Sequence, residues 1–397
     1  MLPLNQNIQN LVAVAQKPIK IGIGLMSGTS LDGLDIALCQ FTGNGLQTEF
    51  KLLKFVTIPY GEGFKKEVRS VFAKREVDLE KVTLLNAYIG TYHGELVIKA
   101  LADWKINHKD VDFIASHGQT IYHAPKRLHG QPNYPNATLQ IGDGDHIAVK
   151  TGILTISDFR QKHIATGGEG APLALYGDVL LGSKAGENRI LLNIGGIANL
   201  TFLPADGDGA KVLCTDIGPG NTLIDAAMMH YFNKTYDEDA TVAYSGKVNE
   251  GLLNALLAHP FFKDSVPKTT GPELFNLDYV LDAQRRSNTL NIEPNDLVST
   301  LTALTVKSIT NFIEANFKDD DLKIFVSGGG ARNPFVIEHL KQALPGVVIA
   351  DTSALGIDPD AKEAILFALL GNEALCGEPM VIGDNPAVLM GKFSFSV

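Results

Sequence analysis

Residues 21–35 read IGIGLMSGTSLDGLD, and this stretch decides the fold. Apolar residues alternate with glycine as far as Leu25, small and hydroxyl-bearing residues follow at 27–30, and a second apolar run begins at Ile36. This order predicts a strand, a tight polar turn and a second strand. A turn of such small residues leaves backbone N–H groups accessible. It therefore suits a phosphate as well as an ordinary hairpin, and the turn by itself leaves both interpretations open.

The same theme recurs in the second half of the chain. Residues 190–203 read ILLNIGGIANLTFL, and further Gly-rich strand ends follow at 218–220 and 328–330. Two halves that each open with strand, glycine turn and strand predict a duplicated α/β fold with a cleft between the copies, and ligands bind at such strand ends. The glycines lack the G-x-G-x-x-G spacing of a dinucleotide fold, and no Gly-Lys-Ser/Thr sequence of a P-loop is present.

Hydrophobic periodicity predicts the remaining elements. We expect strands at 20–26, 34–42, 47–58, 111–115, 211–215 and 323–326, and helices at 61–75, 78–103, from about 222, and at 297–317.

The length of 397 residues exceeds one ordinary core and predicts two domains. We expect an N-terminal extension at 1–19, a first domain at 20–155 and a second domain at 156–384. Residues 385–397 are expected to pack back on the first domain.

Composition excludes several classes of function. The hydrophobic and charged fractions, 45% and 20%, are typical of a soluble globular protein, and the net charge of −10 argues against non-specific nucleic-acid binding. The three cysteines have neither metal-ligand spacing nor a disulfide pattern, which favours a reducing compartment. No apolar run is long enough to span a membrane and the N-terminus does not resemble a signal peptide, so we expect a cytoplasmic protein without a membrane partner.

Residues 26–35, MSGTSLDGLD, resemble the signature of the anhydro-N-acetylmuramic acid kinases. Similar motifs follow in family order and cover nearly the whole chain after roughly the first 19 residues. The resemblance implies the two-domain actin-like sugar-kinase fold, a ribonuclease H-like α/β duplication with an interdomain cleft. The motifs are SHGQT at 116–120, LQIGD at 139–143, DFR at 158–160, GAPL at 170–173, NIGG at 193–196, DIGPGN at 216–221, PK at 267–268, TG at 270–271, FN at 275–276 and GGG at 328–330.

The resemblance implies an ATP-dependent kinase that hydrolyses the 1,6-anhydro ring of 1,6-anhydro-N-acetylmuramic acid and phosphorylates O6. The product, N-acetylmuramic acid 6-phosphate, belongs to cell-wall recycling. Asp216, in the D-x-G-P-G-N motif, would be the general base that takes a proton from the attacking water. From the local sequence, Asp216 could instead cap the helix that starts near 222. The alternative functions are a kinase of a different anhydro-sugar, a related phosphohydrolase, and a catalytically silent sensor of a muropeptide or nucleotide.

The resemblance also implies ATP and Mg²⁺ as cofactors and a homodimer. Asp32 and Asp35 could orient the water shell of Mg²⁺, or either could be an ordinary turn residue. No protein side chain is assigned as a direct metal ligand. The expected cofactor-binding residues are Ser27, Gly28, Thr29, Ser30, Asp32, Gly33, Asp35, Gly195, Gly196, Gly328, Gly329 and Gly330.

On the sugar side, Arg160 could pair with the lactyl carboxylate as a bidentate donor, or form an internal salt bridge with Asp158 or another acid. His117 and Gln119 follow a predicted buried strand and could hydrogen-bond the sugar or be ordinary loop residues. Glu363 matches a family glutamate that contacts the sugar, although an isolated glutamate is commonly a solvated helix residue. The expected substrate-binding residues are His117, Gln119, Arg160, Gly170, Asn221 and Glu363.

Three positions depart from the family pattern. His163 stands where the family usually has an acid, Glu169 where it has glutamine, and Pro272 where it has arginine. If His163 and Glu169 are close in space, they would compensate each other as an exchanged pair. Pro272 removes a cation and a backbone donor. These changes bear on the substrate and the level of activity rather than on the fold.

Overall fold

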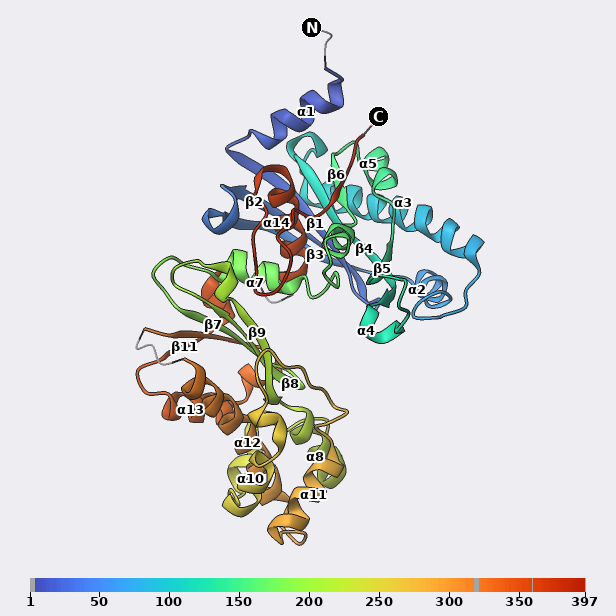
Figure 1. Ribbon diagram of the computed structural model, residues 1–397. Coiled ribbons are helices and arrows are strands. Elements are labelled where there is room, and N and C mark those ends of the chain that lie inside the picture. The colour runs from blue at the N-terminus through green and yellow to red at the C-terminus, as the bar shows by residue number, and fades with distance from the viewer. Residues whose placement is uncertain (1–3, 318–320, 359, 397) are drawn as a thin grey trace. The chain divides into compact units, whose positions relative to one another are not determined.

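The computed structural model describes residues 4–317, 321–358 and 360–396, which divide into two compact units (Figure 1). Unit 1 runs up to Leu181 and resumes at Asp358, and unit 2 is Gly182–Ile357. The sequence-based division at 155/156 therefore differs from the observed one at both ends of unit 2. At the C-terminal end of unit 2 the physical reason is helix α14 (Lys362–Cys376), which packs against the sheet of unit 1 and brings the last part of the chain back to it.

Unit 1 is built on a mixed sheet with the strand order β12-β6-β4-β1-β2-β3, and β5 pairs with β4. β1, β2 and β3 form an antiparallel meander, whereas β4 is parallel to β1 and β6 is parallel to β4. β12, near the end of the chain, adds antiparallel to β6. The strands are β1 (Ile19–Ser27), β2 (Gly33–Thr42), β3 (Glu49–Pro59), β4 (Phe113–Ala124), β5 (Ala137–Ile141), β6 (Thr155–Ser157) and β12 (Lys392–Ser394).

Unit 2 repeats this arrangement. Its sheet has the order β11-β10-β7-β8-β9, in which β7, β8 and β9 form an antiparallel meander, β10 is parallel to β7 and β11 is parallel to β10. Read from the other edge, the sheet has the same strand directions and neighbours as β3-β2-β1-β4-β6 of unit 1, so the predicted α/β duplication is confirmed. The strands are β7 (Arg189–Ile194), β8 (Ile197–Leu203), β9 (Leu213–Pro219), β10 (Lys323–Ser327) and β11 (Val348–Asp351).

The two faces of β1 carry different residues because successive side chains of a strand point to opposite sides. Ile23 and Leu25 join the apolar core that includes Ile89 of α3 (Leu79–Trp104). The glycines between them face the other way. An ideal Cβ at Gly24 would lie 1.8 Å from the carbonyl oxygen of Ala364 in α14, so the helix backbone lies directly against the strand. Figure 1 shows α14, in red, beside β1 and β2.

The other helices of unit 1 have modest lengths apart from α3. The helix predicted over 61–75 is shorter than expected and ends at Arg69. The helices are α1 (Gln6–Ala15), α2 (Glu62–Arg69), α4 (Lys126–His129), α5 (Gly144–Thr151), α6 (Phe159–Ala165) and α7 (Ala174–Gly182).

Unit 2 has two apolar clusters joined by the long helix α12 (Pro294–Asn316). Leu301 and Leu304 pack among neighbouring helices, whereas Ile309 and Ile313, further along the same helix, pack against the sheet. The remaining helices of unit 2 are α8 (Thr222–Phe232), α9 (Thr241–Ser245), α10 (Glu250–Leu257), α11 (Leu277–Ser287) and α13 (Pro334–Ala343).

Gly24→Ala is expected to destabilise unit 1, because the new Cβ would lie 1.8 Å from the Ala364 carbonyl oxygen and force β1 and α14 apart. Overpacking of this kind costs about 1–3 kcal/mol. Gly63→Ala in α2 is the matched control, since nothing lies within 4 Å of its Cβ position and alanine favours a helix. Urea unfolding measures both variants. Equal free energies of unfolding would contradict the close approach of α14.

Candidate active site

The turn between β1 and β2 forms the first part of the candidate site. The Leu31 N–H donates to the Gly28 carbonyl at 3.3 Å, and Leu31 is buried with a φ of 62°. A positive φ is uncommon for a bulky residue and persists only where the surrounding structure imposes it. Thr29 and Ser30 at the tip are exposed. The turn therefore presents small polar groups to solvent, which a phosphate-binding role requires.

A buried chain of hydrogen bonds lies behind this turn. Ser27 Oγ donates to Gln119 Oε1 at 2.5 Å, so it accepts from Tyr60 Oη at 2.8 Å, and Tyr60 Oη in turn accepts from His93 Nε2 at 3.0 Å. Gln119 Nε2 donates to the Gly28 carbonyl at 3.3 Å, which supports this orientation of the amide. All of these hydrogen bonds are therefore donated in one direction, from His93 toward the turn.

Burial keeps these hydrogen-bonded side chains uncharged. It lowers the pKa of His93 to about 3 and raises the pKa of the Tyr60 hydroxyl, so both groups are neutral at physiological pH. A chain of neutral donors and acceptors holds Ser27 and Gln119 in place without titrating near pH 7.

Arg160 of α6 lies beside His117 of β4. Arg160 Nη1 donates to the Gly170 carbonyl at 2.6 Å, and its Nε and Nη2 lie 3.3 and 3.1 Å from His117 Nε2. Burial, reinforced by the Arg160 charge, lowers the pKa of His117 to about 3, so the ring is neutral and Nε2 accepts. The ring of Phe367 in α14 packs 4.8 Å from that of His117. These contacts bring three of the predicted substrate-binding residues together.

Two carboxylates belong to the same region of unit 1. Asp35 Oδ1 accepts from the Thr57 hydroxyl at 2.6 Å, and partial burial of Asp35 raises its pKa despite that bond. Glu363, in the first turn of α14, has an exposed side chain, but desolvation of its carboxyl raises its pKa. The charge of Asp35 adds to that rise and the charge of Arg160 opposes it. Glu363 therefore interacts electrostatically with both Asp35 and Arg160.

His163 and Glu169 have separate partners and do not form the exchanged pair that proximity would have allowed. His163 Nδ1 accepts from the Gly170 N–H at 2.9 Å, its Nε2 donates to Asn385 Oδ1 at 3.2 Å, and Glu169 pairs with Arg127 at 3.3 Å. Burial lowers the pKa of His163, so it acts as a neutral group that holds the Gly170 backbone.

Two interpretations based on local sequence also change. His117 and Gln119 lie inside β4 rather than after it, because the strand continues to Ala124 in order to pair with β5. Asp158 pairs with Lys392 of β12, and not with Arg160, in the described part of the chain.

The Gly-rich strand ends of unit 2 meet at one point. The Gly195 carbonyl accepts from the Asn221 N–H at 2.8 Å, and Asn221 Nδ2 donates to the Ile194 carbonyl at 3.2 Å. Gly328 has a φ of 82°, and an ideal Cβ there would lie 2.7 Å from the Ile194 carbonyl oxygen. Only glycine fits this position without displacing β7. The predicted residues that unit 2 brings together are Gly195, Gly196, Asn221, Gly328, Gly329 and Gly330.

Asp216 lies within β9 of unit 2. Its Oδ2 accepts from the Thr270 N–H at 2.8 Å, and its own N–H donates to the Lys268 carbonyl at 3.0 Å. Burial raises the pKa of Asp216, the Thr270 bond opposes the rise and the charge of Glu273 adds to it. The residue that precedes α8 is Asn221, so Asp216 does not cap that helix.

Pro272 is exposed in the same loop, and its carbonyl accepts from Asn276 Nδ2 at 3.4 Å.

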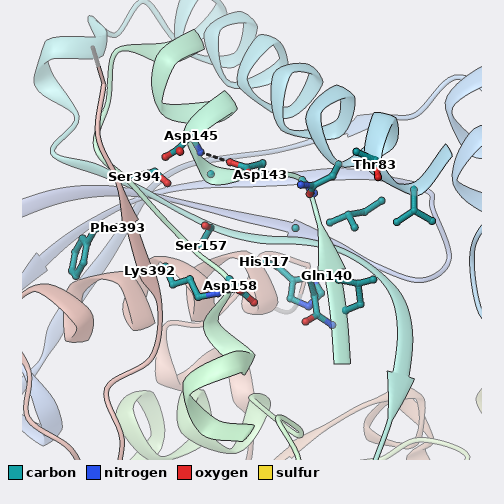
Figure 2. A pocket seen from close by; sticks show the side chains of 17 residues that line it. Thr83, His117, Gln140, Asp143, Asp145, Ser157, Asp158, Lys392, Phe393 and Ser394 are labelled. Carbon is teal, nitrogen blue, oxygen red and sulfur yellow. Dashed lines mark hydrogen bonds and ion pairs between the residues drawn. The ribbon is translucent and has the colours of Figure 1, made fainter. Parts of the chain in front are cut away.

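Unit 1 also contains a pocket of about 530 Å³ beside the start of α5. Figure 2 shows Ser157, Asp158 and Lys392 on one side of it and Gln140 and His117 on the other. Of the predicted site residues, His117 lines this pocket. Because the pocket includes only this one predicted site residue, the candidate site is defined by the hydrogen-bonded and charged side chains and not by the pocket.

A family model described as anhydro-N-acetylmuramic acid kinase matches residues 20–392. The chain belongs to this family. It is 53% identical over 399 residues to the anhydro-N-acetylmuramic acid kinase of Pseudoalteromonas atlantica, covering 99% of this chain and 100% of that protein. It is 39% identical over 397 residues to the protein of the same name from Caldanaerobacter subterraneus, covering 98% of this chain and 100% of that one.

Among solved structures, the chain is similar to the activator of the 2-hydroxyisocaproyl-CoA dehydratase from Clostridium difficile with bound ADPNP. The identity is 12%, the match covers 89% of this chain and 95% of that one, and the TM-score of 0.39 is too low to support a further conclusion. Membership of a kinase family makes the chain a phosphotransferase that uses ATP. Within the described residues, no helix combines the length and the apolar character needed to cross a membrane.

The sequence did not single out every residue that shapes the site. Tyr60 follows a predicted strand without any local signal of its role. His93 gave a partial signal, because it falls on the apolar face of the predicted helix at 78–103. Thr270 and Lys268 lie in family-like motifs, but their contacts with Asp216 join segments more than fifty residues apart, which no local pattern reveals.

Tyr60→Phe is expected to lower the free energy of unfolding by about 1–3 kcal/mol, because the buried His93 Nε2–H and Ser27 Oγ each lose a partner. Tyr88→Phe on α3 is the control, since 49% of Tyr88 is exposed and water can replace its contacts. Chemical denaturation compares the two. An equal and small loss in both variants would contradict the buried chain.

Proposed function

We propose that this chain opens the 1,6-anhydro ring of 1,6-anhydro-N-acetylmuramic acid and transfers the γ-phosphoryl group of ATP to the released O6. Water adds to C1 and loses a proton to Asp216, the C1–O6 bond breaks, and O6 attacks the γ-phosphorus as ADP leaves. The products are N-acetylmuramic acid 6-phosphate and ADP. The names of the full-length relatives support this substrate.

The observation that carries the proposal is the state of the Asp216 carboxylate. One oxygen, Oδ2, is fixed by the Thr270 N–H at 2.8 Å, and no other donor among the described residues bonds the carboxylate. A base needs this combination of a fixed orientation and a free oxygen. Its raised pKa, caused mainly by burial, brings it closer to the pH at which a base is both ionised and able to hold a proton.

The sugar would be held by the group around Arg160. The guanidinium, already bonded to the Gly170 carbonyl, is a planar donor that suits the lactyl carboxylate of the substrate. Neutral His117 keeps the guanidinium in place without adding charge. Glu363 and Asn221 are further proposed sugar contacts. Gln119 is held by Ser27 and Gly28, so its proposed role is to support the turn as well as to contact the sugar.

The nucleotide would use the small polar residues of the turn from Ser27 to Gly33 for its phosphates, and Gly195, Gly196 and 328–330 for close backbone approach. No group of three or more potential metal ligands occurs among the described residues. Mg²⁺ usually keeps several waters and binds one or two carboxylates together with substrate phosphates. Asp32 and Asp35 would hold that water shell, and the ion would neutralise phosphate charge. The homodimer implied by the family resemblance and the cytoplasmic location expected from the sequence stay predictions.

The direct test incubates the protein with 1,6-anhydro-N-acetylmuramic acid, ATP and Mg²⁺ in isotopically labelled water. We expect a ring-opened sugar phosphate whose label is on C1 and absent from the phosphate. Release of ADP without dependence on the sugar would instead favour a phosphohydrolase. A folded protein that binds ATP and yields no product would overturn the proposal.

Asp216→Asn is expected to lower kcat by about 10²–10⁴-fold, because the amide cannot accept the proton from water. The dissociation constant of ATP should change little. Asp239→Asn is the control, since Asp239 is exposed and its φ of 52° suits asparagine as well as aspartate. Steady-state kinetics and calorimetric titration with ATP measure the two effects. Near-normal turnover of the Asp216 variant would refute the assignment of the base.

We expect kcat/KM to fall at acid pH. The apparent pKa of this acid limb should lie above the ordinary pKa of aspartate, about 3.9. The base must be ionised, and burial together with the charge of Glu273 raises the pKa of Asp216. Glu273→Gln removes that negative charge, so it should lower this pKa and move the acid limb to lower pH. Glu238→Gln, at an exposed position of unit 2, should leave the limb in place. A limb that moves to higher pH in the Glu273 variant would contradict the electrostatic account.

A further inference from the structure

Lys268 has an unusual environment for a lysine. Its Nζ donates to the Phe261 carbonyl at 2.6 Å and lies 4.3 Å from the centroid of the Phe261 ring and 5.9 Å from that of Phe312. Burial lowers its pKa, and the charge of Asp264 opposes this. An ammonium group usually remains in water. Here a carbonyl and two aromatic faces replace part of that hydration.

The backbone of the same residue is fastened to β9. The Lys268 N–H donates to Thr215 Oγ1 at 3.0 Å, and the Lys268 carbonyl accepts from the Asp216 N–H at 3.0 Å. Two residues further on, the Thr270 N–H donates to Asp216 Oδ2 at 2.8 Å. The segment 268–270 therefore runs along the strand that carries Asp216 and supplies the hydrogen bond that orients its carboxylate.

The other end of this connection is rigid. Phe261 is 5% exposed in the 3-10 helix Pro260–Lys263, and its ring packs edge-on against Phe275 at 5.3 Å. The neighbouring Phe262 reaches the strand of the proposed base, because an ideal Cβ at Gly218 would lie 3.0 Å from its ring. Lys268 thus ties the loop to a packed aromatic cluster.

We propose that Lys268 is a positioning residue for Asp216: its Nζ, held by Phe261, fixes the loop so that the Thr270 N–H stays on Oδ2 and the other carboxylate oxygen faces the attacking water. This inference rests on the proposed function, because it concerns the same base. One of the three N–H donors of the Lys268 ammonium is taken by the Phe261 carbonyl, so the inferred role acts through the loop rather than through contact with phosphate. A displaced catalytic group loses rate steeply, so a loosened loop should affect turnover more than binding.

The test compares three lysine variants in the full chain. Lys268→Met keeps the aliphatic stem but loses the ammonium, Lys268→Arg can still donate to the Phe261 carbonyl and stack on the ring, and Lys263→Met removes an exposed lysine from the neighbouring 3-10 helix. We expect Lys268→Met to lower kcat by about tenfold or more with both KM values nearly unchanged. Lys268→Arg should restore most of the rate, and Lys263→Met should match the unmodified chain.

A second signature separates positioning from general destabilisation. The Thr270 N–H lowers the pKa of Asp216, whereas Glu273 raises it, so weakening the Thr270 bond should move the acid limb of kcat/KM to higher pH. Thr215→Val, which removes the acceptor of the Lys268 N–H, should shift the limb in the same direction. It also serves as the test if Lys268→Met does not fold, which circular dichroism would show.

Several outcomes would overturn the inference. A kcat unchanged in Lys268→Met, or lowered without any movement of the acid limb, would remove the positioning role. A raised KM for ATP at unchanged kcat would make Lys268 a phosphate ligand instead.

If the unmodified chain shows no kinase activity, the proposed function fails, and amide hydrogen exchange tests the positioning by itself. The Thr270 amide should exchange faster in Lys268→Met than in Lys263→Met, and equal rates would refute the inference.

Discussion

The close contact between α14 and β1 is the constraint on which the first unit depends. An ideal Cβ at Gly24 would lie 1.8 Å from the Ala364 carbonyl oxygen, so the helix backbone rests on the strand. This contact returns the last part of the chain to the sheet formed by its first part. As a result Phe367 packs on the ring of His117, and Glu363 comes under the influence of Arg160. Packing in the core thus determines which polar groups meet at the surface.

Neutral hydrogen-bonded groups hold the polar parts of unit 1. His93 and His117 are both buried with pKa values near 3, so neither gains a proton in the physiological range. Buried polar groups are costly unless they are paired, and His93 pairs with the neutral Tyr60 hydroxyl, which avoids the larger cost of a buried ion. Arg160 and the neighbouring carboxylates keep their charges close to the surface, where a charged ligand can reach them. This separates the groups that give rigidity from those available for binding and proton transfer.

Much of the fold followed from local patterns. The alternation at 21–25 and the small residues at 27–30 predicted β1, the turn and β2, and the recurrence at 190–203 predicted the duplication. The domain boundary did not follow, because no helix was predicted at 362–376 and a local pattern does not show which sheet a helix covers. The candidate site divides in the same way. Motifs located Asp216 and the glycines, whereas the partners of His163 and Glu169 depended on segments distant in sequence.

The sequence alone determined the class of the fold, the family, and the residue types offered for phosphate, sugar and proton transfer. These depend on short-range order, since strand alternation and turn chemistry act over a few residues. The tertiary structure decided what those residues do to one another. It directed the hydrogen bonds from His93 to the turn, and it placed the Thr270 N–H on Asp216. Such contacts join segments far apart in the chain, and each forms only when the core of its own unit brings the strands and helices of that unit together.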